Sequence, residues 1–406
     1  MPKQSAVSAK RAEPSVKLSI RGASRLQARH PWVYRSDIIG ANDIPPGALV
    51  RVHDSRGKFL GTALYSSSSQ IAIRMISHSS VNDLPALIGE RIRGAIAYRK
   101  ENDLISNTDA YRVVFSEADF LPGLIVDRYN DVVTVQVLTQ AMDAAPVRAA
   151  IVQTLREELQ PAGIVERVEA RIRELEQLPP RASGLLWGDK SASEVAMNGV
   201  RFIYDGLEGQ KTGAFLDQRE NYAAAAQYAH GEALDAFCYQ GGFALHLARA
   251  CSQVTGVDSS RPALDAAERN FELNRESLAA REIEWIEANA FDLMRDWSDS
   301  GRKFGTIVLD PPAFAKSKRA LPTALRGYKE LNLRALKMLE PGGILVTCSC
   351  SHHVSFEDFQ TMLAEAARDA HRRIRLLEIR GQSQDHPVVA GIPETAYLKC
   401  VIAWVE

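Results

Sequence analysis

The spacing of hydrophobic positions changes along this chain and separates it into three segments. From residue 206 onward, short apolar runs of strand length alternate with stretches of helical period. The expected strands are Leu234–Phe237, Gln253–Val257, Ile283–Glu287, Phe304–Leu309 and Gly343–Val346, separated by helical stretches such as Ala263–Asn274 and Leu325–Leu339. Strands that alternate with helices in this way predict an α/β fold around a doubly wound parallel sheet.

Two further runs of strand character, Arg373–Arg380 and Ala396–Val405, follow the last predicted helix. We therefore expect a hairpin-like antiparallel pair that closes one edge of the sheet. A nicotinamide-binding Rossmann domain does not normally end in this way. The GxGxxG spacing of dinucleotide-binding folds is also absent, which further disfavours that class.

The segment from residue 16 to residue 82 is typical of a small, β-rich unit. Its one helical stretch begins near Gly22 and places Arg21, Arg25 and Arg29 four residues apart, on a single face. His30-Pro31 should end this helix, because the residue before a proline disfavours the α conformation. The arginine face is equally consistent with a solvated helix and with contacts to nucleic-acid phosphates.

Residues 83–205 predict a mixed α/β unit. Helices are expected at Leu84–Glu101 and near Ala145–Leu159. Asn198-Gly199, between two strand-like runs, is a strong hairpin signal. The expected strands are Gly123–Tyr129, Val132–Thr139, Ile164–Val168, Glu194–Met197 and Val200–Tyr204. No residue pattern in this unit indicates chemistry beyond a scaffold.

Composition narrows the class of protein. No apolar stretch approaches the roughly 20 residues of a membrane helix, and residues 1–15 form a polar, tail-like segment without a signal-peptide core. A cytoplasmic protein without a membrane partner is therefore expected. The five cysteines are odd in number and irregularly spaced, which favours reduced thiols over disulfides.

Charge points to nucleic acid only locally. The formal net charge of the whole chain is −1, which gives no signal for a polyanionic partner. Between Val16 and Leu60, however, eight Lys or Arg stand against three Asp. This bias favours a role for the first unit in binding nucleic acid.

Three consecutive strand ends suggest a cofactor pocket. The first strand runs into Asp235-Ala236-Phe237-Cys238-Tyr239-Gln240-Gly241-Gly242, where glycines let the backbone approach a ligand at a helix N-terminus. Asp258 ends the second strand and is placed to accept hydrogen bonds from ribose hydroxyls. Asn289 ends the third, where adenine recognition is expected. The residues at these three strand ends favour S-adenosylmethionine as the cofactor, and a nucleotide is the alternative ligand.

A polar segment lies upstream of the first of these strands. Gln218, Arg219 and Asn221 carry side chains that can bind a zwitterion, which makes them further candidates for cofactor binding. The same pattern is also that of an ordinary amphipathic helix start, and the sequence does not separate the two.

The chemical centre is expected where the last two parallel strands end. Asp310-Pro311-Pro312-Ala313-Phe314 follows one of them and Thr347-Cys348-Ser349-Cys350-Ser351 follows the other. Ligands of open α/β sheets bind outside these strand ends, so the acid and the thiol should share one cleft. This pair suits methyl transfer to a nucleobase, with Cys350 as the nucleophile and Asp310 binding or protonating the ring.

Other residues of these loops receive substrate roles. Phe314 offers a flat face for an extruded base, and Lys316, Lys318 and Arg319 are candidate phosphate contacts. Cys350 has the alternative of being a buried structural thiol, but its position past the strand end favours it over Cys348.

Metal binding is an alternative for the segment Cys348-Ser349-Cys350-Ser351-His352-His353, which holds several ligand types. Zinc sites usually bring paired ligands from separated segments. The sequence shows no second pair, and we expect no metal.

These residues give the chain a resemblance to the bacterial large-subunit ribosomal RNA cytosine-5 methyltransferases, which join an N-terminal PUA domain to a class I methyltransferase domain. The resemblance covers nearly the whole chain from Val16. Its motifs are His30-Pro31-Trp32-Val33-Tyr34, Lys211-Thr212-Gly213, Leu216-Asp217-Gln218-Arg219, Tyr239 through Phe243, Asp310-Pro311-Pro312, Arg326-Gly327-Tyr328-Lys329, Ser349-Cys350-Ser351 and Asp385-His386-Pro387.

The resemblance implies that Cys350 is the nucleophile and that S-adenosylmethionine is the cofactor. It also implies that Gln218, Tyr239, Asp258 and Asp310 line the cofactor pocket and that the first unit helps to hold the RNA. Protein-free or partly assembled large-subunit RNA is the expected substrate, and a homodimer is compatible with the pattern. Two departures, Asn289 in place of Asp and His352 in place of Gly, concern the adenine contact and the mouth of the substrate site.

The loop after Asp310 carries Pro311-Pro312, without the extra cysteine of a second branch of RNA cytosine-5 methyltransferases. Product release therefore cannot use a second thiol there. Two other functions stay open at this point. One is methylation of a ring or exocyclic nitrogen of guanine or adenine by the same fold. The other is an RNA-binding assembly factor without turnover.

Overall fold

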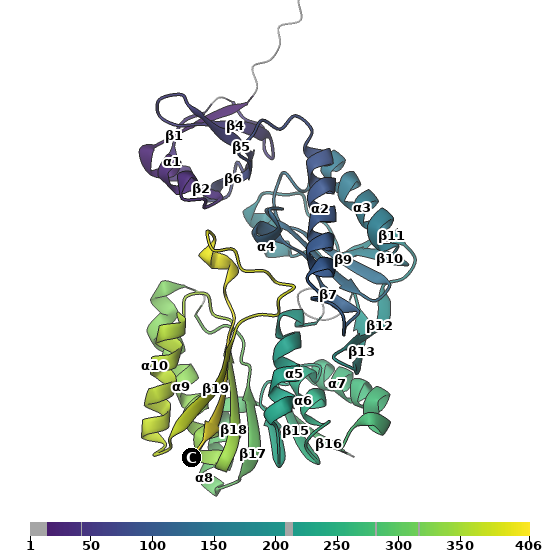
Figure 1. Ribbon diagram of the computed structural model, residues 1–406, viewed down its shortest axis with the longest axis vertical. Helices are drawn as coiled ribbons and strands as arrows, with labels where there is room; N and C mark the ends of the chain where they lie inside the picture. Colours follow the sequence, from purple (N-terminus) through teal and green to yellow (C-terminus); the bar gives the residue numbers. More distant parts are fainter. Residues whose placement is uncertain (1–13, 42, 208–213, 281, 316) are drawn as a thin grey trace, which may run out of the picture.

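The computed structural model describes residues 14–41, 43–207, 214–280, 282–315 and 317–406. The chain folds into three units that follow one another in sequence, with the first at one end of the molecule and the last at the other (Figure 1). Within the described residues, no helix combines the length and the apolar character needed to cross a membrane.

The first unit is a six-stranded sheet in the order β2-β6-β5-β4-β1-β3. Strand β1 pairs in parallel with β4, and the other neighbours are antiparallel. The elements are β1 (Ser15–Leu18), α1 (Ile20–Gln27), β2 (Trp32–Tyr34), β3 (Ile38–Ala41), β4 (Leu49–His53), β5 (Phe59–Tyr65) and β6 (Ile71–Ser77). The predicted β-rich unit is confirmed.

The predicted arginine face is wrong in part. Helix α1 already ends at Gln27, with Ala28 as its C-cap. Arg29 lies beyond this end with a left-handed φ of +66°, so it does not continue the face of Arg21 and Arg25. The helix thus ends three residues before His30, earlier than the end predicted from His30-Pro31.

The second unit combines a five-stranded sheet, in the order β11-β10-β9-β8-β7, with helices packed against it. The helices are α2 (Leu84–Glu101), α3 (Ala145–Leu159) and α4 (Ala170–Leu175), and α2 and α3 have the predicted bounds. The strands are β7 (Ala110–Phe115), β8 (Leu124–Tyr129), β9 (Val132–Val137), β10 (Gly163–Glu166) and β11 (Gly184–Gly188).

The predicted hairpin follows as β12 (Ala192–Met197) and β13 (Val200–Asp205). Asn198 and Gly199 form its two-residue turn with φ of +52° and +79°. Positive φ at both positions is the geometry that an Asn-Gly turn favours.

The third unit is a seven-stranded sheet in the order β16-β15-β14-β17-β18-β20-β19. Its strands are β14 (Glu232–Asp235), β15 (Gln253–Asp258), β16 (Ile283–Glu287), β17 (Phe304–Leu309), β18 (Leu339–Ser349), β19 (Ile374–Arg380) and β20 (Lys399–Val405). Its helices are α5 (Arg219–Tyr228), α6 (Gly242–Leu247), α7 (Arg261–Asn274), α8 (Ala290–Ser300), α9 (Leu321–Met338) and α10 (Phe356–Asp369).

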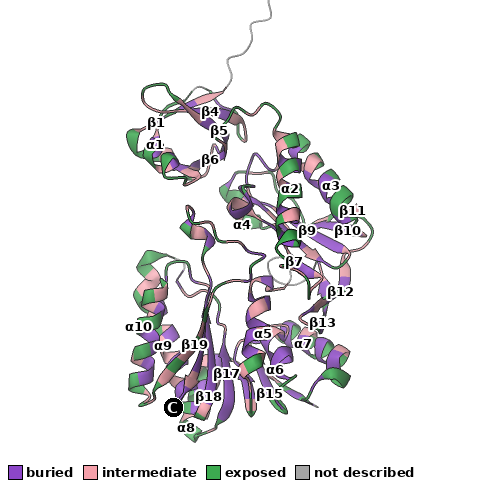
Figure 2. Ribbon diagram, viewed as in Figure 1, coloured by how far each residue is buried: buried purple, intermediate pink, exposed green. Residues whose placement is uncertain are grey.

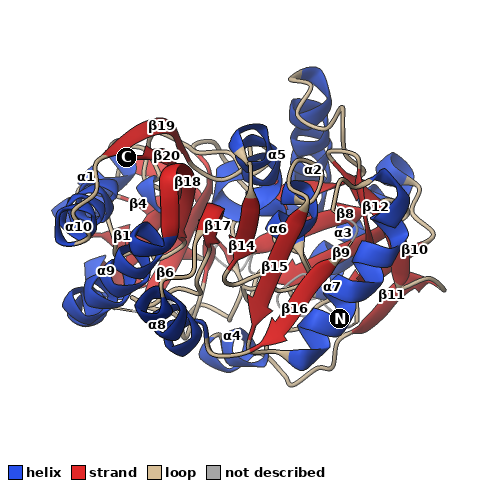
Figure 3. Cartoon of the chain, turned by 90° about the horizontal axis from the view of Figure 1, so that it is seen from below, coloured by secondary structure: helices blue, strands red, loops and turns tan. Residues whose placement is uncertain are grey.

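Helices cover both faces of this sheet (Figure 3), and each face has its own cluster of buried side chains. The inner strands, such as β17 and β20, are almost continuously buried, whereas the edge strands β16 and β19 are largely half-buried or exposed (Figure 2). The predicted doubly wound sheet with an antiparallel terminal pair is confirmed. Strand β20 lies between β18 and β19 and is antiparallel to both.

The bounds of some strands differ from the prediction. Strand β18 begins at Leu339, well before Gly343, because Leu339 pairs with Phe304 across an irregularity in the ladder. Strand β20 begins at Lys399 and not at Ala396, because a short 3-10 helix at Pro393–Thr395 precedes it.

A buried ion pair ties the second unit to the loop between β19 and β20. The Arg99 side chain is fully buried and donates to both carboxylate oxygens of Asp119, at 2.9 and 2.8 Å. It also donates to the carbonyl of Asp385 at 2.7 Å. Removing one member of such a pair leaves the other charge buried without its partner.

We expect the substitution Arg99→Met to lower the free energy of unfolding by about 3–5 kcal/mol. Arg93→Met is the matched control, since Arg93 pairs with Glu157 and Glu158 at a half-exposed position and should cost under about 1 kcal/mol. Urea denaturation followed by circular dichroism compares the two variants. Equal losses in both would contradict this account of the buried pair.

Candidate active site

A cavity of about 460 Å³ opens at the carboxyl ends of the parallel strands of the third unit. Residues from five strand ends and from the start of α5 line it. They include Gln218, Tyr222, Cys238, Tyr239, Gly242, Asp258, Asn289, Phe291, Asp310, Pro311, Pro312, Phe314 and Cys350. The structure thus brings together the acid, the thiol and much of the expected cofactor pocket.

The glycine loop after β14 requires its glycines. Gly241 has a φ of +86° and is the N-cap of α6. A Cβ on Gly242 would lie only 2.6 Å from the phenol of Tyr222. Because there is no room for a side chain at Gly242, the backbone of the loop itself forms part of the cavity wall.

Asp258 holds this loop in place from the end of β15. One carboxylate oxygen accepts a hydrogen bond from the Tyr239 backbone N–H at 3.0 Å, and the other accepts from Ser260 N–H at 2.9 Å. Each carboxylate oxygen can accept a second hydrogen bond. Asp258 can therefore support the loop and bind hydroxyl groups of a ligand at the same time.

Asp235 does not line the cavity, contrary to expectation. It lies beneath the loop, fully buried, where one oxygen accepts from the Ala244 N–H at 2.9 Å. Burial raises the pKa of its carboxyl group to about 8. Its part is to support the start of α6. Gly241 likewise shapes the loop without lining the cavity.

Some side chains at the start of α5 face the cavity, and others face away from it. Gln218 and Tyr222, one helical turn apart, face the cavity. Arg219 instead donates to the carbonyl of Leu104 at 3.0 Å, and Asn221 to that of Gly381 at 3.0 Å. The prediction that these two residues contact the cofactor is therefore not supported, because the helical period turns them away.

Gln218 leaves a polar group for a ligand. Its amide nitrogen is buried and finds no hydrogen-bond acceptor within the described part of the chain. A buried donor of this kind normally has a partner. The carboxylate of a methionine moiety would supply one, so the residues present fit the expected cofactor at this end of the cavity.

At the far end, Asn289 lines the cavity but also caps α8. Its side-chain oxygen accepts from the Phe291 N–H at 2.9 Å. The oxygen of Asn289 is therefore shared between the helix and any ligand. Phe291 adds an aromatic surface beside it.

Cys350 lies just past the end of β18 and, unlike the other four cysteines, is not buried. Cys348 is fully buried in the strand, as expected, and burial raises the pKa of its thiol well above the ordinary value. The structure thus favours Cys350 over Cys348 as the accessible thiol in this cavity.

Ser351 connects the two loops of the chemical centre. Its hydroxyl lies 2.9 Å from the Tyr328 hydroxyl and accepts from the Ala315 N–H at 3.2 Å. Ala315 belongs to the loop after Asp310. Ser351 therefore joins the loop that follows Asp310 to the segment that carries Cys350.

Phe314 lines the cavity with its ring 4.7 Å from that of Tyr328 and 5.8 Å from that of Phe291. Lys318 and Arg319 are exposed in a short 3-10 helix nearby. Lys316 and the motif Lys211-Thr212-Gly213 fall outside the described residues.

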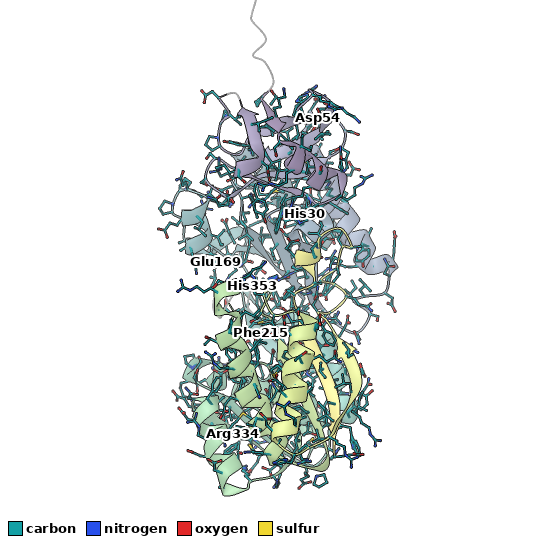
Figure 4. The ribbon with its side chains drawn as sticks, turned by 90° about the vertical axis from the view of Figure 1, so that its left-hand side faces the viewer. His30, Asp54, Glu169, Phe215, Arg334 and His353 are labelled. Atoms are coloured by element: carbon teal, nitrogen blue, oxygen red, sulfur yellow. The ribbon has the colours of Figure 1, made fainter. Side chains whose placement is uncertain are left out.

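The arginines of the first unit have partners within the chain. Arg21 pairs with Asp37 at 2.7 Å but keeps most of its side chain exposed. Arg25 and His30 approach Glu394, at 4.0 and 3.1 Å, and so contribute to the junction with the loop before β20. Figure 4 shows His30 at this junction. Part of the hydrogen-bonding capacity of Arg25 is therefore used within the protein and not available to RNA.

Sequence reasoning missed a second cavity of about 330 Å³ at this junction. All three units line it, and it shares Phe215 and Asp217 with the first cavity. The Tyr397 hydroxyl donates to Asp217 at 2.6 Å inside it, and burial raises the pKa of Tyr397 well above the ordinary value. In the sequence, the signals for this cavity are the motifs that contain Trp32 and His386, because both residues line it.

Lys399 is a residue near the end of β18 that the sequence did not predict, because its place depends on how β20 pairs with β18.

Among the described residues, no group of three or more metal-ligating side chains is brought together. Cys348 is buried in its strand while His352 and His353 are exposed.

Comparison with known proteins agrees with this architecture. Residues 16–78 match the model of a PUA-like domain, and residues 132–402 match that of an S-adenosylmethionine-dependent methyltransferase. The crystal structure of SMU.776, named as a methyltransferase and complexed with SAH, superposes with a TM-score of 0.81 at 19% identity, covering 96% of this chain and 99% of that one.

Curated relatives cover nearly the whole chain. Ribosomal RNA large subunit methyltransferase I of Photobacterium profundum is 37% identical over 94% of this chain and 96% of its own length. The protein of the same name from Shewanella denitrificans is 37% identical over 96% of this chain and 98% of its own length.

The methyltransferase model spans more than half of the chain, a PUA-like domain precedes it, and the relatives align almost from end to end. These matches agree with the seven-stranded sheet and with a cavity that fits S-adenosylmethionine. The chain belongs to the S-adenosylmethionine-dependent methyltransferase family, together with the proteins named ribosomal RNA large subunit methyltransferase I.

Proposed function

We propose that this protein methylates carbon 5 of a cytosine in large-subunit ribosomal RNA through a covalent adduct with Cys350. The names of the relatives support the RNA substrate. The observation that carries the carbon-5 chemistry is the accessible thiol of Cys350 in the same cavity as Asp310. Methylation of a nitrogen needs no such thiol.

Carbon 5 of cytosine is a weak nucleophile until the ring is activated. The Cys350 thiolate forms a bond to carbon 6, and the electron pair of the 5,6 double bond becomes available at carbon 5 as an enamine. After methyl transfer, a base removes the proton from carbon 5. The electron pair left behind re-forms the 5,6 double bond as the carbon–sulfur bond breaks and its electron pair returns to the sulfur.

Asp310 is proposed to bind the base edge during this sequence. Attack at carbon 6 raises the electron density on the ring nitrogen and carbonyl. A carboxyl group that donates a proton or hydrogen bond there stabilises the developing charge. Asp310 follows β17 and lines the cavity with Cys350, so it is suitably placed.

S-adenosylmethionine, when bound, supplies an electrophilic methyl group. Gln218, Tyr239 and Asp258 would hold it along the glycine-loop side of the cavity, with Asn289 and Phe291 at the far end. The ring of Phe314 is proposed to stack on the extruded base. Arg21, Arg29, Lys318 and Arg319, all exposed, are the proposed phosphate contacts.

Cys350→Ala tests the covalent mechanism. We expect its rate of 5-methylcytosine formation to fall at least about 10³-fold, since removing a nucleophile abolishes the covalent route. Mass spectrometry of nucleosides from methylated, protein-free ribosomal RNA measures the product. Cys251→Ala is the control, because Cys251 is buried and does not line the cavity.

Two outcomes would reject the carbon-5 proposal. One is full activity of Cys350→Ala. The other is a product methylated on a ring or exocyclic nitrogen of guanine or adenine, which would establish the second type of chemistry on the same fold.

Asp258→Ala tests the cofactor site. We expect its affinity for S-adenosylmethionine to fall about tenfold to a hundredfold, since hydrogen bonds to a charged group contribute about 1.5–3 kcal/mol. Titration calorimetry measures it, with Asp265→Ala as control because Asp265 is exposed on α7. Unchanged binding in Asp258→Ala would show that this carboxylate does not contact the cofactor.

A further inference from the structure

Lys399 is a buried lysine with an unusual set of partners. Only 8% of the residue is exposed. Its ammonium group donates to the carbonyl of Ser351 at 2.7 Å and to that of Tyr397 at 2.8 Å. Both partners are neutral carbonyls, and among the described residues Lys399 forms no ion pair with a carboxylate. Buried charges normally pair with an opposite charge.

The strand register places Lys399 beside the segment that carries Cys350. Lys399 is the first residue of β20 and pairs with Ser349, the last residue of β18. Its side chain then reaches the carbonyl of Ser351. Cys350 lies between these two points of attachment, and an ammonium group carries three donors, of which two are used by carbonyls.

The charges of the two side chains influence one another. The pKa of Lys399 is lowered to about 8, because burial lowers it by more than the negative charge of the Cys350 thiolate raises it. Such an interaction is reciprocal, so the ammonium group favours the thiolate as much as the thiolate favours the ammonium group.

Among the described residues, the other titratable side chains that face this pair do not supply a second positive charge. Partial desolvation and the nearby charge of Lys399 lower the pKa of the His352 ring, although the residue as a whole is exposed. Burial raises the pKa of Tyr328 and of Tyr397, so all three side chains are neutral near pH 7. Asp310, which follows β17, lines the same cavity as Cys350, and an ionised carboxylate there would disfavour a thiolate. Among the described residues, Lys399 is a cation placed to offset this effect.

We propose that Lys399 is a positioning residue whose ammonium group pairs with the Cys350 thiolate and keeps it ionised for attack. This inference rests on the proposed role of Cys350 as the nucleophile. When the thiol ionises, its proton leaves to solvent and Lys399 keeps all of its own protons. The sulfur electron pair then forms the bond to carbon 6, and when that bond breaks the ammonium group stabilises the departing thiolate.

The test measures the alkylation of Cys350 by iodoacetamide as a function of pH, without RNA or cofactor. Only the thiolate reacts, so the rate reports ionisation. Mass spectrometry of the Cys350 peptide gives the rate, and the four buried cysteines serve as internal references. The variants are Lys399→Met, which removes the charge, and Lys399→Arg, which keeps it. Lys303→Met is the control, since Lys303 is exposed at the opposite end of β17.

We expect alkylation at pH 7.5 to be about tenfold slower or more in Lys399→Met, which corresponds to a shift of about one pH unit in the inflexion of the profile. Lys399→Arg and Lys303→Met should stay within about threefold of the wild type. A Lys399→Met profile that coincides with that of the wild type would overturn the proposal.

The proposal stays testable if Lys399→Met does not fold. The wild-type profile must then show its inflexion below about pH 8.5, the ordinary value for a cysteine, and an inflexion at or above this value would overturn it. Because alkylation requires no methyl transfer, the outcome is independent of the activity of Cys350→Ala. Failure of the carbon-5 proposal and failure of this one are therefore distinguishable.

Discussion

The site depends on the hydrogen-bonded register of β18 with its two neighbours. On one side Thr347 pairs in parallel with Leu309, and on the other Ser349 pairs in antiparallel fashion with Lys399. These two registers bring Asp310, Cys350 and Lys399 to one end of the sheet. A slip of one residue would turn every side chain of β18 to the opposite face. Because the second half of β18 is buried on both faces, such a slip would force its side chains into closely packed layers shaped for other residues, and the core therefore protects the geometry of the site.

Ser351 shows how the fold holds the chemical centre together. Its hydroxyl is bound by the Tyr328 hydroxyl and the Ala315 N–H, and its carbonyl accepts from the Lys399 ammonium group. One residue thus joins α9, the loop after Asp310 and the start of β20. The hydrogen bonds of the neighbouring Ser351 fix the backbone at Cys350, while the Cys350 side chain itself lines the cavity. This arrangement fits a nucleophile, which must be fixed in position and still reach the substrate.

The sequence allowed prediction of those features that follow from local pattern and from the geometry of parallel strands. The helices Leu84–Glu101 and Ala145–Leu159 have the predicted bounds, and Asp258, Asp310 and Cys350 share one cavity because parallel strands end at the same edge. Arg219 and Asn221 could not be placed in this way, since only the helical phase of α5 turns them from the cavity. Lys399 was missed because its neighbours are distant in sequence and depend on the pairing of β20.

At the junction of the three units, the first unit contacts the loop that leads to the proposed catalytic residues. The contacts between His30, Arg25 and Glu394 are partly exposed, and pairs of this kind contribute little to stability. Trp32, in contrast, donates to Glu117 of the second unit at 2.8 Å from a less exposed position. The first unit is therefore attached more firmly to the second unit than to the loop before β20. That loop leads directly into Lys399, so a substrate that moves it on binding would also act on the residue beside Cys350.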